Sequence, residues 1–211
     1  IIINDGSTDS TENIIFDYIK LGVPIIYEKQ ENLGFASARN KALSIANSEW
    51  VAIVDHDDIC LPKRLEIQAK QITDNPNSKL FFGDALLFDS KNNKNINHFS
   101  KFNMNKIKIK NNKDFHTSLI IDGCFIVSST VVFNKTAAIE IGKFKEKLIT
   151  LADYDFFISL SKKYLFAYSK EIISKMRIHS MQSSVTNQKK YFNELNTLLS
   201  FFLLQKHFNF F

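Results

Sequence analysis

Short apolar segments alternate with helical patterns along the first third of the chain, and this alternation limits the folds it can adopt. Apolar runs occur at residues 1–3, 23–27 and 50–54. Between these runs, and again after Pro62, apolar residues recur at the spacing of an α-helix. Strand and helix repeated three times indicate a parallel sheet with right-handed crossovers. The sequence therefore predicts an α/β fold with a mostly parallel sheet flanked by helices.

The remainder of the chain has shorter elements. Asn- and Lys-rich residues 91–114 are expected to form a surface loop, and Asp153 opens a helix that ends near Tyr164 with Phe156 inward. The other predicted elements are strands on both sides of a hairpin turn at 89–93, a strand at 125–133, a short helix at 137–141 and an apolar-rich helix at 191–211. We predict one domain over residues 1–190, followed by the apolar helix of residues 191–211.

Composition excludes several classes of protein. Hydrophobic residues make up 45% of the 211 residues and include 20 Phe, which is enough for a substantial core and excludes a disordered chain. No apolar run reaches the roughly 20 residues of a membrane-spanning helix. The net charge of +5 is too small to indicate a nucleic-acid-binding protein, and suits anionic lipid or a phosphorylated ligand equally. Cys60 and Cys124 fit neither a metal nor a disulfide spacing, which predicts free thiols in a reducing compartment.

Four acidic or polar motifs are candidates for chemistry. The first, at residues 55–58, places Asp55, His56, Asp57 and Asp58 after a predicted buried strand, where ligands bind in open α/β sheets. Carboxylates this close repel one another unless a cation lies among them, and oxygen ligands suit Mg²⁺ or Mn²⁺. The alternative is a loop whose acids cap the following helix.

The second motif, at residues 4–9, leads from the first strand into a helix. Gly6 permits a positive φ there, and Asp5 is suited to accept hydrogen bonds from a base or a sugar hydroxyl. An ordinary turn with a helix cap explains the same residues.

The third and fourth motifs lie in the second half of the chain. Asp153 and Asp155 begin a helix, where a carboxylate acts either as a cap or as a general base aimed into a cleft. Arg177 and His179 alternate on one face of a strand, where they either meet a diphosphate or form a solvated edge.

Taken together and in this order, the motifs resemble those of glycosyltransferase family 2, the bacterial-type enzymes with the GT-A fold. The resemblance covers residues 1 to about 187. It is carried by the motifs at residues 3–9, 32–34, 38–40, 54–58, 152–155 and 177–179.

The resemblance implies a role for individual residues. Asp5 matches the carboxylate that reads the nucleotide base, commonly uracil, and Arg39 matches an arginine near the nucleotide. Asp55 and Asp57 match the family's Asp-x-Asp motif, with Asp55 near the ribose or sugar and Asp57 as a ligand of Mn²⁺ or Mg²⁺. The remaining two are Asp153, which matches the catalytic base, and His179, which matches a histidine near the metal and diphosphate.

The family also implies an activity and a setting. We expect an inverting, metal-dependent transfer of sugar from a UDP-sugar to the hydroxyl of a saccharide or lipid-linked acceptor, in bacterial surface polysaccharide or glycolipid synthesis. The expected location is the cytoplasm, including the inner face of the membrane. The helix of residues 191–211 either packs on the domain or lies at a lipid surface.

Two departures from the family keep other interpretations open. Ala152 stands where the family usually has Glu, so that Asp155 is a candidate to share the role of the base. The chain also begins on an apolar strand without Met, and the family's first strand and helix are expected to precede it. A degenerate module that binds a nucleotide-sugar or a partner without transfer is the alternative function. An aspartate-based phosphohydrolase is disfavoured, because Ile59 and Cys60 follow the acids where a hydroxyl residue is needed.

Overall fold

A computed structural model describes residues 1–89, 95–102, 112–180 and 182–208. The first half of the chain forms β1 (Ile2–Asp5), α1 (Thr11–Lys20), β2 (Tyr27–Gln30), α2 (Phe35–Ile45), β3 (Trp50–Ala52), β4 (Ile59–Cys60), α3 (Arg64–Asp74), β5 (Ser78–Phe88), β6 (Asn95–Asn97) and α4 (His98–Lys101). The second half forms α5 (Asn112–Ile121), the 3₁₀-helix η1 (Ser128–Thr130), β7 (Val132–Asn134), α6 (Lys135–Glu140), α7 (Ala152–Lys163), β8 (Leu165–Arg177), α8 (Ser183–Thr186) and α9 (Gln188–Phe208).

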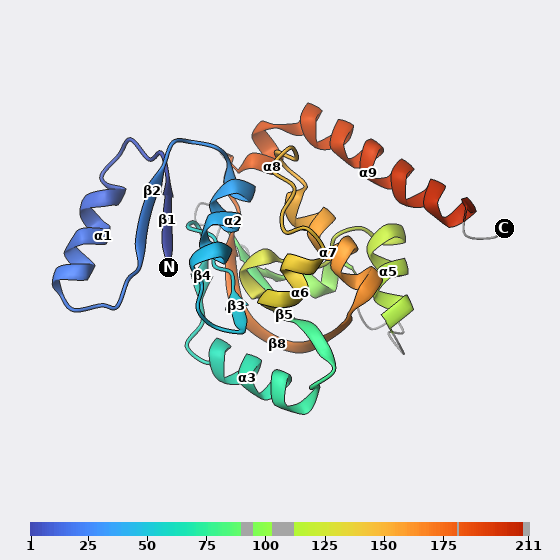
Figure 1. The fold of residues 1–211 in the computed structure, drawn as a ribbon, viewed down its shortest axis with the longest axis horizontal. Helices are drawn as coiled ribbons and strands as arrows, with labels where there is room; N and C mark the ends of the chain where they lie inside the picture. Colours follow the sequence, from blue (N-terminus) through green and yellow to red (C-terminus); the bar gives the residue numbers. More distant parts are fainter. Residues whose placement is uncertain (90–94, 103–111, 181, 209–211) are drawn as a thin grey trace.

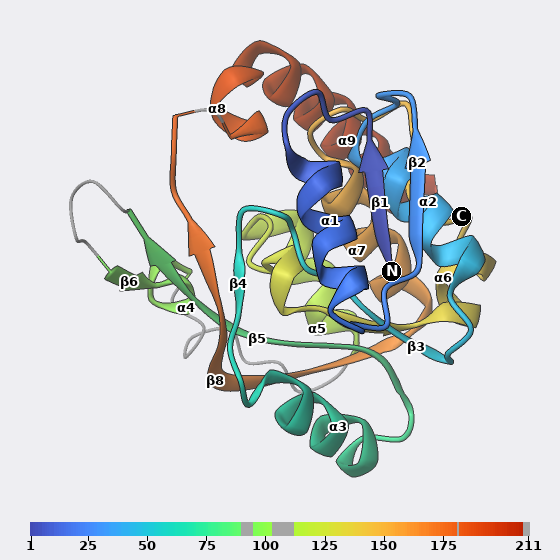
Figure 2. The ribbon, with the colours of Figure 1, turned by 90° about the vertical axis from the view of Figure 1, so that its left-hand side faces the viewer.

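These elements form two sheets rather than one. β1 and β2 form a small parallel pair, and a larger sheet has the order β3-β7-β5-β8-β4, with β6 also paired to β5. Helix α3 lies on one face of the larger sheet, and α5, α6 and α7 lie on the other (Figures 1 and 2). The α/β class is confirmed.

Strand directions differ from the expected mostly parallel sheet. Only β1–β2 and β5–β8 are parallel in the described chain, whereas β3–β7, β5–β7, β5–β6 and β4–β8 are antiparallel. The first strand–helix–strand unit therefore behaves as predicted, but β3 takes an antiparallel neighbour from the second half of the chain. The sheet is mixed because β5 pairs with the strand that follows it in a hairpin, while β7 runs antiparallel to both β3 and β5.

An open space separates the two sheets. In the described part of the chain β1 pairs with β2 alone and β3 with β7 alone, so the edges of β1 and β3 that face each other carry no strand partner. A cavity of about 500 Å³ lies there, lined by residues 1–5, by α2 and by residues 51–56.

Two predicted strands are displaced by local chemistry. The strand expected at residues 23–27 forms instead at Tyr27–Gln30, because Pro24 has no N–H and the Val23 N–H bonds back to the Tyr18 carbonyl. The strand expected at residues 125–133 is interrupted by η1, after which only Val132–Asn134 pairs. The predicted hairpin of β5 with the strand after it is confirmed.

The surface loop expected at residues 91–114 is wrong in part. Residues 95–97 pair with β5, α4 buries Phe99, and α5 begins at Asn112. The rest of that prediction, residues 91–94 and 103–111, lies outside the described residues.

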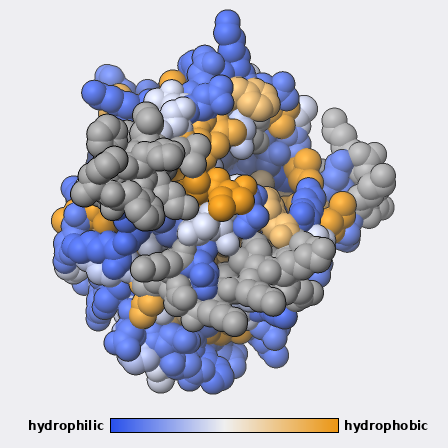
Figure 3. All heavy atoms as spheres, turned by 90° about the vertical axis from the view of Figure 1, so that its right-hand side faces the viewer, coloured by the Kyte–Doolittle hydropathy of each residue, from blue (hydrophilic) through white to orange (hydrophobic). Residues whose placement is uncertain are grey.

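Aromatic side chains fill the core between the larger sheet and α5–α7. Phe82 contacts the rings of Phe99, Phe115, Phe125 and Tyr168. The predicted inward face of α7 is confirmed, since its residues Phe156, Phe157 and Leu160 are fully buried. Hydrophobic atoms on the face toward α5 gather in a hollow surrounded by hydrophilic side chains (Figure 3).

The C-terminal helix starts three residues earlier than predicted, at Gln188. Its first half packs on the domain, with Leu198 6% exposed in the same core. The end of the predicted helix, residues 209–211, lies outside the described residues. Among the described helices, none combines the length and the apolar character needed to cross a membrane.

Burial of His98 predicts a pH dependence of stability. Its imidazole is partly buried at the start of α4, and burial, with Lys101 nearby, lowers the pKa of His98 from its usual 6.5 to about 4. The unfolded chain therefore binds this proton near pH 6.5 and the folded chain only near pH 4, so this contribution to stability is complete above pH 6.5 and is lost as the pH falls toward 4.

We expect His98→Gln to remove this dependence. Between pH 7 and pH 5 the free energy of unfolding of the wild type should fall by about 2 kcal/mol more than that of the variant. Urea unfolding at the two pH values measures the difference, with His56→Gln as the control because His56 is exposed. Equal losses in wild type and His98→Gln contradict the prediction.

Candidate active site

Asp55 lies just beyond β3 and is held from two sides. Its backbone N–H donates to Ser129 Oγ at 2.9 Å, and Arg39 Nη2 on α2 donates to its Oδ1 at 2.6 Å. The Arg39 guanidinium packs against the rings of Phe35 and Phe144, which keeps it nearly buried. The predicted pair Arg39 and Asp55 is thus brought together, with Arg39 fixing the carboxylate.

A turn after Asp55 aims the next two acids at the end of β8. The Asp58 N–H donates to the Asp55 carbonyl at 3.1 Å and closes the turn. Arg177 then bonds to both following acids: its N–H donates to Asp58 Oδ1 at 3.0 Å, and its Nε donates to the Asp57 carbonyl at 3.2 Å. The end of β8 is therefore tied to residues 55–58.

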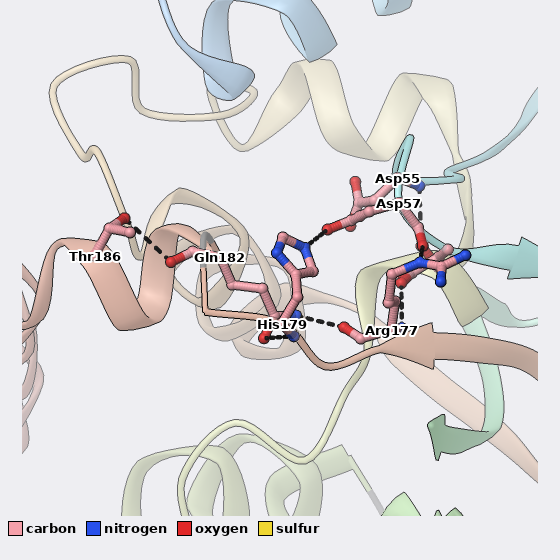
Figure 4. Close-up of polar contacts among 8 residues, drawn as sticks. Asp55, Asp57, Arg177, His179, Gln182 and Thr186 are labelled. Carbon is pink, nitrogen blue, oxygen red and sulfur yellow. Dashed lines mark hydrogen bonds and ion pairs between the residues drawn. The ribbon is translucent and has the colours of Figure 1, made fainter. Parts of the chain in front are cut away.

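Asp57 and His179, which lie far apart in the sequence, face each other. His179 Nε2 lies 3.0 Å from Asp57 Oδ2 (Figure 4). The segment that carries His179 is fixed by Gln182, whose Nε2 donates to the Arg177 carbonyl at 2.6 Å, and Thr186 Oγ1 donates to the Gln182 carbonyl at 3.1 Å. Asp57 and His179 belong to two different sequence motifs, and the fold brings them together as one pair.

Negative charge accumulates in this turn. Burial raises the pKa of Asp58 above its usual value, although hydrogen bonds from Ser129 and Arg177 oppose the shift; Asp57 and Asp55 add to it. A cation would relieve this repulsion.

The Asp57–His179 pair has the chemistry of metal ligands. A carboxylate oxygen suits Mg²⁺ or Mn²⁺ and an imidazole nitrogen is a common metal ligand, and here the two atoms contact each other directly at 3.0 Å. In the described chain no group of three His, Cys, Asp or Glu side chains is placed to hold a metal ion. Asp57 and His179 are therefore the two side chains that would hold a divalent cation here.

Asp5 has a different environment from the one predicted. Its carboxylate accepts hydrogen bonds from Gln30 Nε2 at 2.7 Å and from the N–H groups of Leu33 and Gly34, each at 2.9 Å. Asp5 therefore fastens the loop that begins α2. This loop also passes close to Gly6. Glycine is required there, because φ is 76° and a Cβ would lie 2.8 Å from the Asn32 backbone nitrogen.

Asp5 nevertheless shares a cavity with two other predicted residues. Asp5, Arg39 and Asp55 all line the space of about 500 Å³ between the sheets. The three residues expected at the nucleotide-sugar thus border one cavity, at the carboxyl ends of β1 and β3.

Asp153 lies in the first turn of α7, as predicted, and both of its oxygens have a hydrogen-bond donor. Ser128 Oγ donates to Oδ2 at 2.9 Å, and the N–H of Tyr154 donates to Oδ1 at 2.8 Å. Because Ser129 next in the chain bonds to Asp55, η1 links Asp153 to the turn of residues 55–58.

Asp155 does not share the surroundings of Asp153. Its side chain is 2% exposed and accepts a hydrogen bond from Lys145 Nζ at 2.6 Å. Burial raises the pKa of Asp155, and the bond to Lys145 opposes the shift. Ala152 is fully buried in the core. The idea that Asp155 shares the role of the base has no support in this geometry.

The sequence interpretation missed the serines and the polar face of α3. Ser128, Ser129 and Thr130 form a run of hydroxyl side chains inside an otherwise apolar segment, which was the available signal. On α3, Arg64 and Gln68 are buried, whereas the apolar Leu65 is 65% exposed.

Arg64 and Gln68 satisfy backbone carbonyls beneath the site. Arg64 Nη2 donates to the carbonyls of Ile53 at 2.7 Å and Val131 at 3.0 Å, and Gln68 Nε2 donates to that of Thr130 at 2.8 Å. These bonds anchor both the end of β3 and η1. Burial lowers the pKa of Arg64, with Cys60 and Asp55 opposing the shift.

Comparison with known proteins identifies the family. The family model of glycosyl transferase family 2 matches residues 1–134. The chain belongs to glycosyltransferase family 2. An uncharacterised glycosyltransferase of Methanocaldococcus jannaschii is 33% identical over 98% of this chain and 67% of its own length. One from Rickettsia prowazekii is 28% identical over 92% of this chain and 60% of its own length. The chain thus spans about two thirds of these family 2 relatives.

Solved structures show the GT-A fold of the family. Staphylococcus aureus TarS, in complex with UDP, superposes with a TM-score of 0.65 at 17% identity, over 93% of this chain and 53% of that one. The mannosyltransferase PcManGT of Pyrobaculum calidifontis, in complex with GDP-Man and Mn²⁺, has a TM-score of 0.59 at 16% identity, over 85% and 47%. The predicted GT-A fold is confirmed.

Proposed function

We propose that this family 2 domain transfers a sugar from a UDP-sugar to an acceptor hydroxyl, with inversion at the anomeric carbon and with a divalent cation. The observation that carries the proposal is the arrangement of the acids. Asp5, Arg39 and Asp55 border the cavity, Asp57 faces His179 beside it, and η1 bonds to both Asp55 and Asp153. TarS binds UDP and UDP-GlcNAc, and PcManGT binds GDP-Man with Mn²⁺, which supports a nucleotide-sugar as donor.

Each residue has a chemical task in this proposal. Asp153 accepts the proton of the acceptor hydroxyl, whose oxygen attacks the anomeric carbon from the side opposite the leaving nucleotide. Ser128 and the N–H of Tyr154 orient its carboxylate. The Arg177 guanidinium, held beside residues 55–58, supplies positive charge near the leaving diphosphate. A Mg²⁺ or Mn²⁺ held by Asp57 and His179 would supply Lewis-acid stabilisation of that diphosphate.

The acceptor and its setting extend the proposal beyond the donor. A saccharide or a lipid-linked sugar supplies the hydroxyl, in surface polysaccharide or glycolipid synthesis at the inner face of the membrane. The mixed surface of the described domain, with a chain net charge of +5, is compatible with a phosphorylated carrier.

Binding of UDP tests the donor site. In the full-length protein, UDP at 100 times its dissociation constant, with Mn²⁺, should add about 2.7 kcal/mol of stability. That corresponds to a rise in melting temperature of about 5–10 °C for a domain of this size. We expect Asp57→Asn to abolish the part of the shift that needs Mn²⁺, because the amide loses the charge that binds the cation.

A matched control separates this effect from a general loss of charge. Asp74→Asn removes an exposed acid at the end of α3, paired only to Lys70 in the described chain, and should leave the shift unchanged. A shift with GDP but none with UDP would support the nucleotide site and indicate a GDP-sugar as the donor instead of a UDP-sugar. No shift with any nucleotide would reject the proposal in favour of a module that has lost catalysis.

A further inference from the structure

Helix α9 carries an acid on the face that packs against the domain. Tyr191, Leu195 and Leu198 contact the core at the spacing of one helix face, and Glu194 lies on that face between them. A carboxylate is rarely placed on a packing face unless it has partners there.

The partners of Glu194 are four donors in one short loop. The N–H of Ile149 donates to Oε1 at 2.7 Å, while Oε2 accepts from the N–H groups of Thr150 at 3.0 Å and Leu151 at 3.1 Å and from Thr150 Oγ1 at 2.7 Å. Burial raises the pKa of Glu194, but these hydrogen bonds outweigh burial and the pKa lies below its usual value. The carboxylate is therefore ionised at neutral pH.

This loop leads directly into the helix of the candidate base. Leu151 is the N-cap of α7 and makes no side-chain cap hydrogen bond; Glu194 instead accepts the N–H of Leu151 together with those of the two residues before it. A negative charge at this end of α7 is also favoured by the helix dipole. Asp153 follows only two residues after Leu151.

Tyr191 lies on the same face of α9 and packs against the core. Burial raises the pKa of Tyr191, with Cys124 and Asp153 adding to the shift. Ser128 holds Asp153 from the sheet side, and α9 holds the start of its helix from the other side.

We propose that Glu194 is a positioning residue for Asp153: α9 fixes the loop that leads into α7, up to its N-cap, and so sets where the candidate base projects. The inference rests on the proposed function for its catalytic meaning, but the contact it describes does not. α9 is then a part of the active domain rather than an appended apolar segment.

Hydrogen exchange in the full-length protein tests the contact without any substrate. In Glu194→Ala, the amides of residues 149–151 should exchange about tenfold faster or more, because their acceptor is lost. Glu194→Gln keeps one oxygen and should give an intermediate rate. Unchanged exchange at residues 149–151 in Glu194→Ala would overturn the proposal.

The matched control acts on the C-terminal end of α7, opposite the end that Glu194 contacts. Glu140 on α6 pairs with Lys163 and Tyr164 at the C-terminal end of α7. Glu140→Gln therefore loosens α7 at its far end, and should leave the exchange of residues 149–151 as in the wild type.

Kinetics then separate positioning from mere stabilisation. With UDP-GlcNAc and GDP-Man as probe donors, Glu194→Ala should lower kcat by about tenfold to a hundredfold, while KM and UDP affinity change by about twofold at most. Glu140→Gln should leave kcat unchanged. An equal fall of kcat in both variants contradicts a positioning role. If the wild type turns over neither donor and binds no nucleotide, the proposed function fails, while the exchange experiment still decides whether Glu194 holds the loop.

Discussion

Replacing Asp153 by Asn is expected to lower the rate of sugar transfer by about 10²–10⁴-fold, the usual contribution of a general base. The amide has the same shape as the carboxylate but cannot accept the proton of the acceptor hydroxyl. Its oxygen can still accept the N–H of Tyr154, and its NH₂ can donate to Ser128 Oγ in place of the bond that the serine now donates. The affinity for UDP should therefore change little. The initial rate of nucleoside diphosphate release and a UDP titration measure the two quantities.

Asp155→Asn is the control for this experiment. The two acids are two residues apart on α7, yet Asp155 is buried against Lys145 while Asp153 bonds to Ser128. Asp155→Asn should lower stability and leave the chemical step intact. A comparable loss of rate in both variants would show that the acids act together, and full activity of Asp153→Asn would remove Asp153 from the mechanism.

The sequence predicted those parts of the fold in which one periodicity dominates. The helices that begin at Phe35 and Ala152 and the strand at Ser78–Phe88 follow apolar patterns that leave little ambiguity. Predicted strand bounds were wrong where a single side chain changed the backbone hydrogen bonding. Pro24 removes an N–H and shifts β2, and the hydroxyls of residues 128–130 break an apolar strand into η1.

The polar face of α3 was not predicted from the sequence. Apolar residues indicate the helix, but the face of α3 that packs on the domain meets backbone carbonyls that need donors. Arg64, Gln68 and Gln71 supply them, and Leu65 faces outward. No pattern within a helix reveals which carbonyls of distant strands lack a partner, so this exchange of polar for apolar residues could not be predicted.

The resemblance placed both Asp57 and His179 near one metal, and the structure brings these two side chains to 3.0 Å. The links between motifs were not predictable, because Ser128, Ser129 and Glu194 act through hydrogen bonds to residues that are remote in the sequence. The role of Asp5 in fastening the loop before α2 likewise depends on three donors that only the fold assembles.

Arg64→Ala is expected to lower the free energy of unfolding by about 3–5 kcal/mol, through a cavity and through lost donors. Arg64 is 1% exposed and is one of the largest fully buried side chains in the described chain. Its removal leaves the carbonyl of Ile53 without that donor, and the carbonyl of Val131 keeps only the N–H of Ile53. Urea unfolding measures the loss, with exposed Lys63→Ala as the control, which should change stability by about 0.5 kcal/mol or less.

Arg64→Met distinguishes the two causes of this loss. Met fills most of the volume but donates no hydrogen bond. It should therefore restore the stability lost through the cavity, but not the stability lost through the carbonyls that have no donor. Burying a guanidinium is itself unfavourable, and one of its nitrogens, Nη1, has no hydrogen-bond partner. If Arg64→Met is as stable as the wild type, then the charge is not retained for stability. The bond to the Ile53 carbonyl, two residues before Asp55, then explains its presence, and Arg64→Met should weaken UDP binding although the domain remains folded.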